Sequence, residues 1–140
     1  MTSAVLILNA GSSSIKFALY ETERLEVLCR GAIDGIGSTP RFTPKGTTAV
    51  RLTEAPALPQ PATHDNLTAW LLDMLRTRLP DVTITAAGHR VVHGGARFND
   101  PVRVDDAVMA ELDQLVSLAP LHEPHNLATI RAVTKAWGQL

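Results

Sequence analysis

The segment VLILNAGSSSIKFALY, residues 5–20, decides how the chain begins to fold. Its first four residues, Val5 to Leu8, are all apolar, as in a central strand that is covered on both faces of a sheet. After the polar run from Asn9 to Ser14, apolar side chains alternate at positions 15, 17 and 19, which is typical of a strand with one buried face. The segment therefore predicts a strand, a Gly/Ser turn and a second strand. Lys16 is expected to point away from the core, because its neighbours Ile15 and Phe17 point into it.

The first half of the chain continues as a meander of short strands. Residues 25–29 predict a third strand. Eight of the eighteen Gly and Pro residues lie between positions 33 and 63, which predicts loops with short edge-strand candidates at 41–43 and 49–52. We therefore expect an antiparallel meander before the first helix.

The second half alternates between helical and strand patterns. Apolar residues at helical spacing predict an amphipathic helix that Asp65 caps and Pro80 ends. Residues 82–88 return to a strand pattern. Further helices are expected to start at Asp105 or Asp106 and at Pro124. This order predicts a single α/β or α+β domain over residues 1–140, with a mixed sheet and flanking helices.

Composition limits the class of partner. Thirteen basic and fourteen acidic side chains leave a formal charge of −1 without a long run of either sign, which argues against nucleic acid or an anionic membrane. No apolar segment approaches the roughly 20 residues of a membrane span. A single cysteine, Cys29, cannot form an internal disulfide and is expected to be a buried apolar residue. The sequence favours a cytoplasmic protein with a small-molecule or protein partner.

The turn NAGSSSIK, residues 9–16, has the composition of a phosphate site. Gly and Ser let backbone N–H groups converge, add hydroxyl donors and allow close approach, and Lys16 supplies positive charge. The amide oxygen of Asn9 is a possible Mg²⁺ ligand. This is not a Walker A loop, because the pattern after Lys16 is strand-like rather than helical. An ordinary polar hairpin turn is the alternative interpretation.

The segment GHRVVHGG, residues 88–95, places Arg90 and Val92 on one face of an extended chain. A planar guanidinium beside an apolar side chain suits a short aliphatic carboxylate. The alternative is an arginine in a surface ion pair.

The four histidines between positions 89 and 125 also raise the question of a metal. Their pairs lie in a strand-like segment and across Pro124, so neither pair has the helical support of a zinc site. His122 is the strongest candidate for another role. With Glu123 as cap and Pro124 at the first helical position, His122 lies near a helix N-terminus, where anions are favoured.

Three segments together, VLILNAGSSSIKFALY, GHRVVHGG and LAPLHEPHNL at residues 118–127, resemble the acetate kinase (acetokinase) family in order and spacing. The resemblance covers the whole chain but only the N-terminal third of a family member. It implies the ribonuclease H-like fold of the superfamily that includes sugar kinases, actin and heat-shock chaperones. Glu123 departs from the family pattern, which usually has Asn or another uncharged residue there.

The resemblance also implies a role for each candidate residue. Asn9 would position Mg²⁺ or Mn²⁺. The side chains near the transferred phosphate of ATP would be Ser12, Ser14 and Lys16. Arg90 would bind acetate or the phosphoryl group, His122 would contact the phosphoryl group, and the methyl pocket would be lined by Val92 and Leu121. The reaction it implies is reversible phosphoryl transfer from ATP to acetate, giving acetyl phosphate and ADP.

The family's C-terminal nucleotide-binding domain has no counterpart in these 140 residues. We therefore expect the segment to be inactive alone, and the full-length protein to be a homodimer. Two alternatives remain at this point. One is a kinase for propionate or butyrate, and the other is a non-catalytic folded fragment or partner-binding module.

Overall fold

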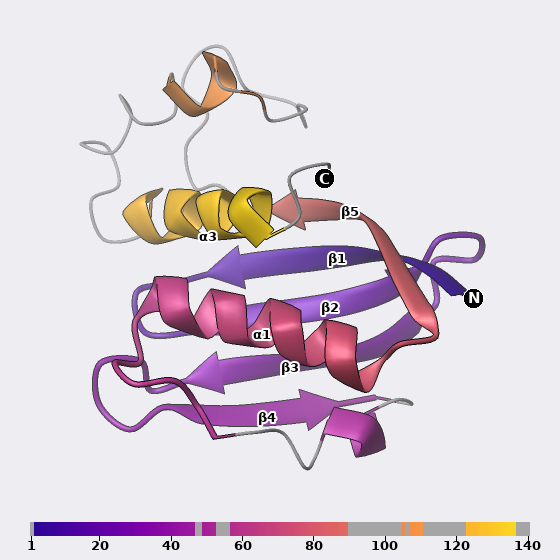
Figure 1. The fold of residues 1–140 in the computed structure, drawn as a ribbon, viewed down its shortest axis with the longest axis horizontal. Coiled ribbons are helices and arrows are strands. Elements are labelled where there is room, and N and C mark those ends of the chain that lie inside the picture. Colours follow the sequence, from indigo (N-terminus) through magenta and orange to yellow (C-terminus); the bar gives the residue numbers. More distant parts are fainter. Residues whose placement is uncertain are drawn as a thin grey trace.

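The computed structural model describes residues 2–46, 49–52, 57–89, 105, 107–110 and 123–136. In these residues five strands form one mixed sheet in the order β4-β3-β2-β1-β5, with two long helices packed on it (Figure 1). The elements are β1 (Thr2–Ala10), β2 (Ile15–Glu21), β3 (Val27–Asp34), β4 (Arg41–Lys45), a 3₁₀ helix (Ala49–Leu52), α1 (His64–Arg78), β5 (Val82–His89) and α3 (Glu123–Ala136). The predicted mixed sheet with flanking helices is confirmed.

Strands β1 to β4 form the predicted antiparallel meander, whereas β5 pairs with β1 in parallel. The register places Asn9 opposite Lys16 and Leu8 beside His89. The first β-hairpin and the end of β5 therefore reach the same edge of the sheet.

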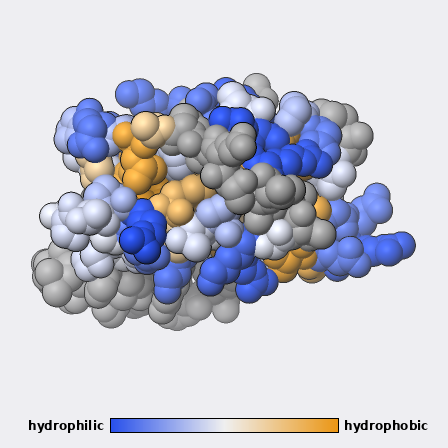
Figure 2. Space-filling view, turned by 90° about the horizontal axis from the view of Figure 1, so that it is seen from below, coloured by the Kyte–Doolittle hydropathy of each residue, from blue (hydrophilic) through white to orange (hydrophobic). Residues whose placement is uncertain are grey.

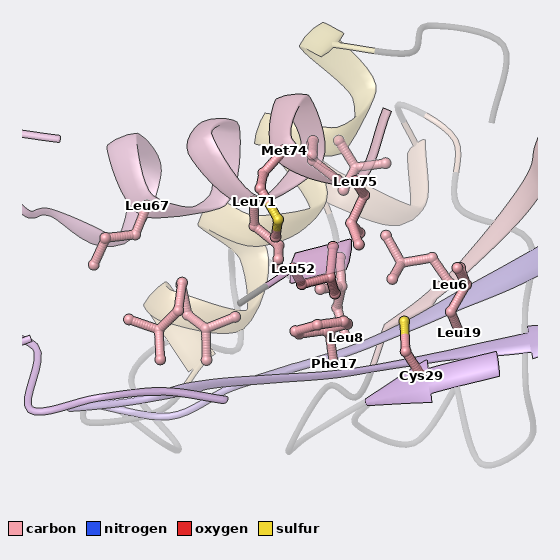
Figure 3. Close-up of a cluster of buried hydrophobic side chains, with 14 of the residues drawn as sticks. Leu6, Leu8, Phe17, Leu19, Cys29, Leu52, Leu67, Leu71, Met74 and Leu75 are labelled. Atoms are coloured by element: carbon pink, nitrogen blue, oxygen red, sulfur yellow. The ribbon is translucent and has the colours of Figure 1, made fainter. Parts of the chain in front are cut away.

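The core lies between the sheet and the two helices, which cover the same face (Figure 1). Leu71 and Met74 point from α1 toward the sheet, where Leu8 and Phe17 lie below them (Figure 3). Each such side chain contributes about 1.5–3 kcal/mol when fully buried. Cys29 belongs to this core and is completely buried, as the sequence predicts.

Helix α1 begins slightly earlier than predicted. Thr63 is the N-cap, and its hydroxyl accepts a hydrogen bond of 3.2 Å from Asn66 N. Asp65 lies in the first turn instead, where its charge complements the helix dipole. The helix ends at Arg78, before Leu79 and Pro80, as expected.

Two expectations for the meander are wrong in detail. Residues 49–52 form a 3₁₀ helix rather than a strand, and this turn carries the fully buried Leu52 into the core. Strand β3 starts at Val27 because Leu25 adopts a positive φ of 57° in the preceding turn.

The expectation that residues 5–8 are covered on both faces is also wrong. Leu6 and Leu8 are buried under the helices, but Ile7 on the opposite face is 40% exposed. In the part of the chain that the structure describes, the face of the sheet away from α1 and α3 carries no helix. Seen from the β4 side, the described residues at the surface are mostly hydrophilic, with small apolar areas between them (Figure 2).

The later helices agree with the sequence where they are described, except that α3 begins at Glu123, the expected cap, and not at Pro124. Residues 107–110 are helical, and the Asp105 carboxylate caps them by accepting a 2.8 Å hydrogen bond from Val108 N. In α3 the predicted apolar residues Leu127, Ile130 and Val133 are buried, and Trp137 lies outside the described residues. Neither these helices nor α1 combine the length and apolarity needed to cross a bilayer.

Candidate functional site

Several element ends meet at one end of the sheet. The C-terminal ends of the parallel strands β1 and β5 lie there, together with the turn between β1 and β2 (Figure 1). The N-terminal ends of α1 and α3 point to the same end. Helix N-termini carry partial positive charge and unpaired N–H groups, so this end of the domain favours an anion.

The turn at residues 11–14 is held by three hydrogen bonds. Gly11 N donates to Ser14 O over 2.8 Å and Ile36 N donates to Ser13 O over 2.9 Å. The third bond joins His64 Nε2, at the start of α1, to Gly11 O over 2.6 Å. A Cβ atom at position 11 would lie 3.3 Å from Ser14 Oγ, a close contact that a small shift of this hydroxyl would relieve. The turn is thus built into the domain and differs from a loose solvent loop.

Ser12 is exposed at the tip of this turn and Ser14 is half-buried at its end. Their hydroxyl groups are donors beside a backbone that is already fixed by hydrogen bonds. The arrangement is compatible with the predicted phosphate site and leaves the role of each serine a prediction.

Lys16 lies on the open face of the sheet, as the alternation in β2 predicts. Ile15 and Phe17 on either side are buried, whereas Lys16 is exposed. With Asn9 opposite on β1, Lys16 borders a hollow of about 400 Å³ on this face. Two of the residues proposed for phosphate and metal therefore share one surface.

Sequence reasoning missed Arg30 and Lys45, which line the same hollow. They are paired in register on β3 and β4, so the hollow carries three basic side chains together with the acidic Asp34. The alternation of β3 was the signal that could have found Arg30, because Cys29 and Ile33 face the core. His64 was also missed, since nothing in the sequence indicates that it reaches residue 11.

His89 ends β5 beside Leu8. Burial lowers the pKa of its imidazole to about 4, because the charged form loses its hydration. The Nδ1 atom is completely buried and has no hydrogen-bond partner among the described residues. The ring is therefore neutral at physiological pH.

Arg90, Val92, Leu121 and His122 lie outside the described residues. Their roles remain predictions. Strand β5 ends just before Arg90, and α3 begins just after His122. These two element ends lie at the same end of the sheet as the turn (Figure 1).

The described residues fit a metal ion in a limited way. Asn9 provides one amide oxygen, and no three His, Cys, Asp or Glu side chains gather as ligands in the described ranges. Mg²⁺ in phosphoryl-transfer sites is commonly held by few protein oxygens and by substrate phosphates. Lys16 opposite Asn9 disfavours a bare cation. Asn9 thus fits Mg²⁺ as one direct or water-mediated oxygen for an ion that arrives with phosphates.

The fold and the Gly/Ser turn define the class of protein. A mixed sheet in the order β4-β3-β2-β1-β5, with an antiparallel meander and a parallel β5, is a ribonuclease H-like domain of the actin-like ATPase class. The sequence model of the Acetokinase family matches residues 4–140, and the chain belongs to this family.

Individual relatives agree with this assignment. An acetate kinase of Rhodopseudomonas palustris (strain TIE-1) is 43% identical over 139 residues, which cover 96% of this chain and 35% of the relative. An acetate kinase of Deinococcus deserti is 40% identical over 139 residues, with 96% and 33% covered. The chain therefore spans about a third of the length of the curated relatives it matches.

Solved structures give the same result. A propionate kinase from Francisella tularensis subsp. tularensis SCHU S4 matches with a TM-score of 0.79 and 28% identity, over 99% of this chain and 35% of its own. Porphyromonas gingivalis acetate kinase matches with a TM-score of 0.71 and 28% identity, over 95% and 34%.

Proposed function

We propose that the chain is the N-terminal part of an acetate kinase, a phosphotransferase that reversibly moves the γ-phosphoryl group of ATP to acetate, giving acetyl phosphate and ADP. Family membership and the curated relatives named acetate kinase support this reaction. The observation that supports the role of this segment is the hydrogen-bonded turn at residues 11–14, at the end of the sheet where two helix N-termini converge.

The described residues supply binding and charge rather than covalent chemistry. Phosphoryl transfer depends on in-line positioning and on neutralising the charge on the equatorial phosphate oxygens. In our proposal the hydroxyls of Ser12 and Ser14 donate hydrogen bonds to the transferred phosphate. The ammonium of Lys16 balances its charge from the adjacent face. Asn9 orients Mg²⁺ or Mn²⁺ that is bound to ATP, and the metal supplies further charge neutralisation.

The acceptor side is assigned to the residues that follow β5 and precede α3. Arg90 binds the acetate carboxylate or the phosphoryl group through its planar fork of donors. Val92 and Leu121 line the pocket for the methyl group, and His122 donates to the phosphoryl group at the start of α3. These assignments rest on the family motifs in the sequence.

A chimaeric enzyme tests this function directly. Residues 1–140 replace the matching third of the Rhodopseudomonas palustris acetate kinase, and acetyl phosphate is measured as its hydroxamate. We expect the chimaera to be active and the 140-residue chain alone to show no turnover. Activity in the isolated chain would contradict the split of the site between two parts, and an inactive but folded chimaera would contradict the assignment.

Lys16→Ala in this chimaera tests the charge at the turn. We expect kcat/KM for ATP to fall by roughly 10- to 100-fold, because one charged contact to the transferred group is lost. Lys135→Ala is the matched control, since Lys135 is an exposed lysine in the last turn of α3, away from the turn. Equal activity of the Lys16 and Lys135 variants would remove Lys16 from the site.

The acid that is phosphorylated is assigned as acetate. One structural neighbour is a propionate kinase, so propionate and butyrate are the competing acceptors to measure in the same chimaera. A longer acid needs a deeper pocket, and one methylene changes discrimination by roughly 10- to 200-fold. A higher kcat/KM for propionate than for acetate would reassign the substrate.

A non-catalytic module is the alternative from another class. Titration of the 140-residue chain with acetyl phosphate and MgATP separates the two, because a half-site retains weak anion binding that Arg90→Ala removes.

We further propose a cytoplasmic location and a homodimer for the full-length protein. Light scattering of a full-length chain tests the dimer, and a monomer at working concentration would contradict it.

A further inference from the structure

We propose that His64 is a positioning residue for the phosphate-binding turn. By holding the Gly11 carbonyl toward α1, His64 keeps the next N–H group, that of Ser12, directed outward to an anion. This inference deepens the proposed function and rests on it, because it takes the turn at residues 11–14 to be the phosphate site.

The contact between the two residues is short and determines which ring nitrogen of His64 carries a proton. His64 Nε2 lies 2.6 Å from Gly11 O in a half-buried position, although the residues are 53 positions apart in sequence. A carbonyl oxygen can only accept a hydrogen bond, so Nε2 carries the proton and donates it. This assignment holds for the neutral ring and for the charged ring alike.

The planarity of the peptide bond connects this contact to the anion site. In a trans peptide the C=O of one residue and the N–H of the next point in opposite directions. Fixing the Gly11 carbonyl toward His64 therefore fixes the Ser12 N–H toward the other side. Glycine has the widest conformational freedom of any residue, so without a restraint the peptide between Gly11 and Ser12 turns over easily. A turned peptide would direct a carbonyl oxygen, which repels phosphate, to where the N–H belongs.

Two other turn carbonyls, those of Ser13 and Ser14, are held by backbone groups. Gly11 N binds Ser14 O and Ile36 N binds Ser13 O, whereas the Gly11 carbonyl is bound by a side chain. His64 is itself fixed as the first residue of α1, since its own carbonyl accepts a 2.7 Å hydrogen bond from Thr68 Oγ1. The helix packed on the core thus sets the orientation of the turn.

The test measures binding of inorganic phosphate to the 140-residue chain by NMR, following the backbone amides of residues 11–14. We expect His64→Ala to weaken binding roughly three- to tenfold, the size of one neutral hydrogen bond. His64→Gln keeps an N–H donor at similar reach and is expected to restore most of the affinity. Thr63→Ala is the control, because it removes the cap of the same helix while leaving the His64 contact in place.

The second readout is the chemical shift and hydrogen-exchange rate of the Ser12 amide without ligand. We expect His64→Ala to change both and Thr63→Ala to leave them near the wild-type values. Unchanged phosphate affinity and unchanged Ser12 amide in His64→Ala would overturn the role of His64. If the wild-type chain binds no phosphate, the proposed function of the turn fails, and with it the link to an anion. A Ser12 amide that still responds to His64→Ala would then leave His64 as a restraint on the turn alone.

Discussion

Acidification from pH 7 to pH 5 is expected to destabilise the domain through His89. The pKa of this imidazole is about 4 in the folded chain, against an ordinary value of 6.5. Between these two values the unfolded chain binds a proton that the folded chain excludes. Stability from this group is therefore present above pH 6.5 and is lost as the pH falls toward 4.

The size of the effect follows from the two pKa values. Protonation linkage gives a loss of about 2 kcal/mol between pH 7 and pH 5, approaching about 3 kcal/mol below pH 4. This is a substantial share of the 5–15 kcal/mol that is typical of a small domain. The cause is burial of the ring, whose Nδ1 is completely enclosed.

Urea denaturation of the wild-type chain and of His89→Asn at pH 7, 6 and 5 isolates this contribution. Asn cannot titrate in this range, so subtracting its curve removes the effect of the carboxylates and of the other histidines. From pH 7 to pH 5 we expect the wild-type chain to lose about 2 kcal/mol more of its free energy of unfolding than the His89→Asn variant loses. A pH-independent difference, or an NMR titration of the His89 Cε1 proton with a midpoint near 6.5, would refute the reasoning.

Three further substitutions test the packing and the helix cap by urea denaturation. Gly31→Ala is expected to cost about 1–3 kcal/mol, because a Cβ there would lie 2.7 Å from Phe17 Cε1. Ala32→Ser on the open face is the control and should change the free energy of unfolding by no more than about 0.5 kcal/mol. Equal losses in the two variants would contradict the close contact between position 31 and Phe17. Thr63→Ala is expected to cost about 1 kcal/mol while Thr63→Ser keeps the cap, so a neutral alanine variant would argue against it. Leu71→Ala should cost about 2–5 kcal/mol at a fully buried site, and a loss below about 1 kcal/mol would place Leu71 outside the core.

Local patterns in the sequence predicted much of the fold. The alternation around Lys16 gave both the second strand and its buried face, because a strand repeats every two residues. Pro80 marked the end of α1, since proline cannot continue a helix. These features depend on neighbours in sequence and are therefore readable from it.

Features that depend on distant contacts were not readable. Leu52 lies in a short 3₁₀ helix because its side chain enters the core, whereas its sequence also suits a strand. The open face beside Ile7 depends on which elements pack on the sheet, and an apolar run alone does not report that. In the candidate site the turn and Lys16 were anticipated. The contact of His64 with Gly11 joins residues 53 positions apart and became visible only in the fold.

The parallel pairing of β1 with β5 has a consequence for how the chain acquires its shape during synthesis. Thr2 pairs with Val82, so the first strand gains its second neighbour only after some eighty residues have left the ribosome. The meander β1 to β4 uses short-range closures and can assemble earlier, whereas the long-range closure is expected to be slow. Until then one side of β1 exposes unpaired backbone groups that can recruit strands of other chains. Aggregation of nascent or heat-stressed protein is therefore expected to start at β1.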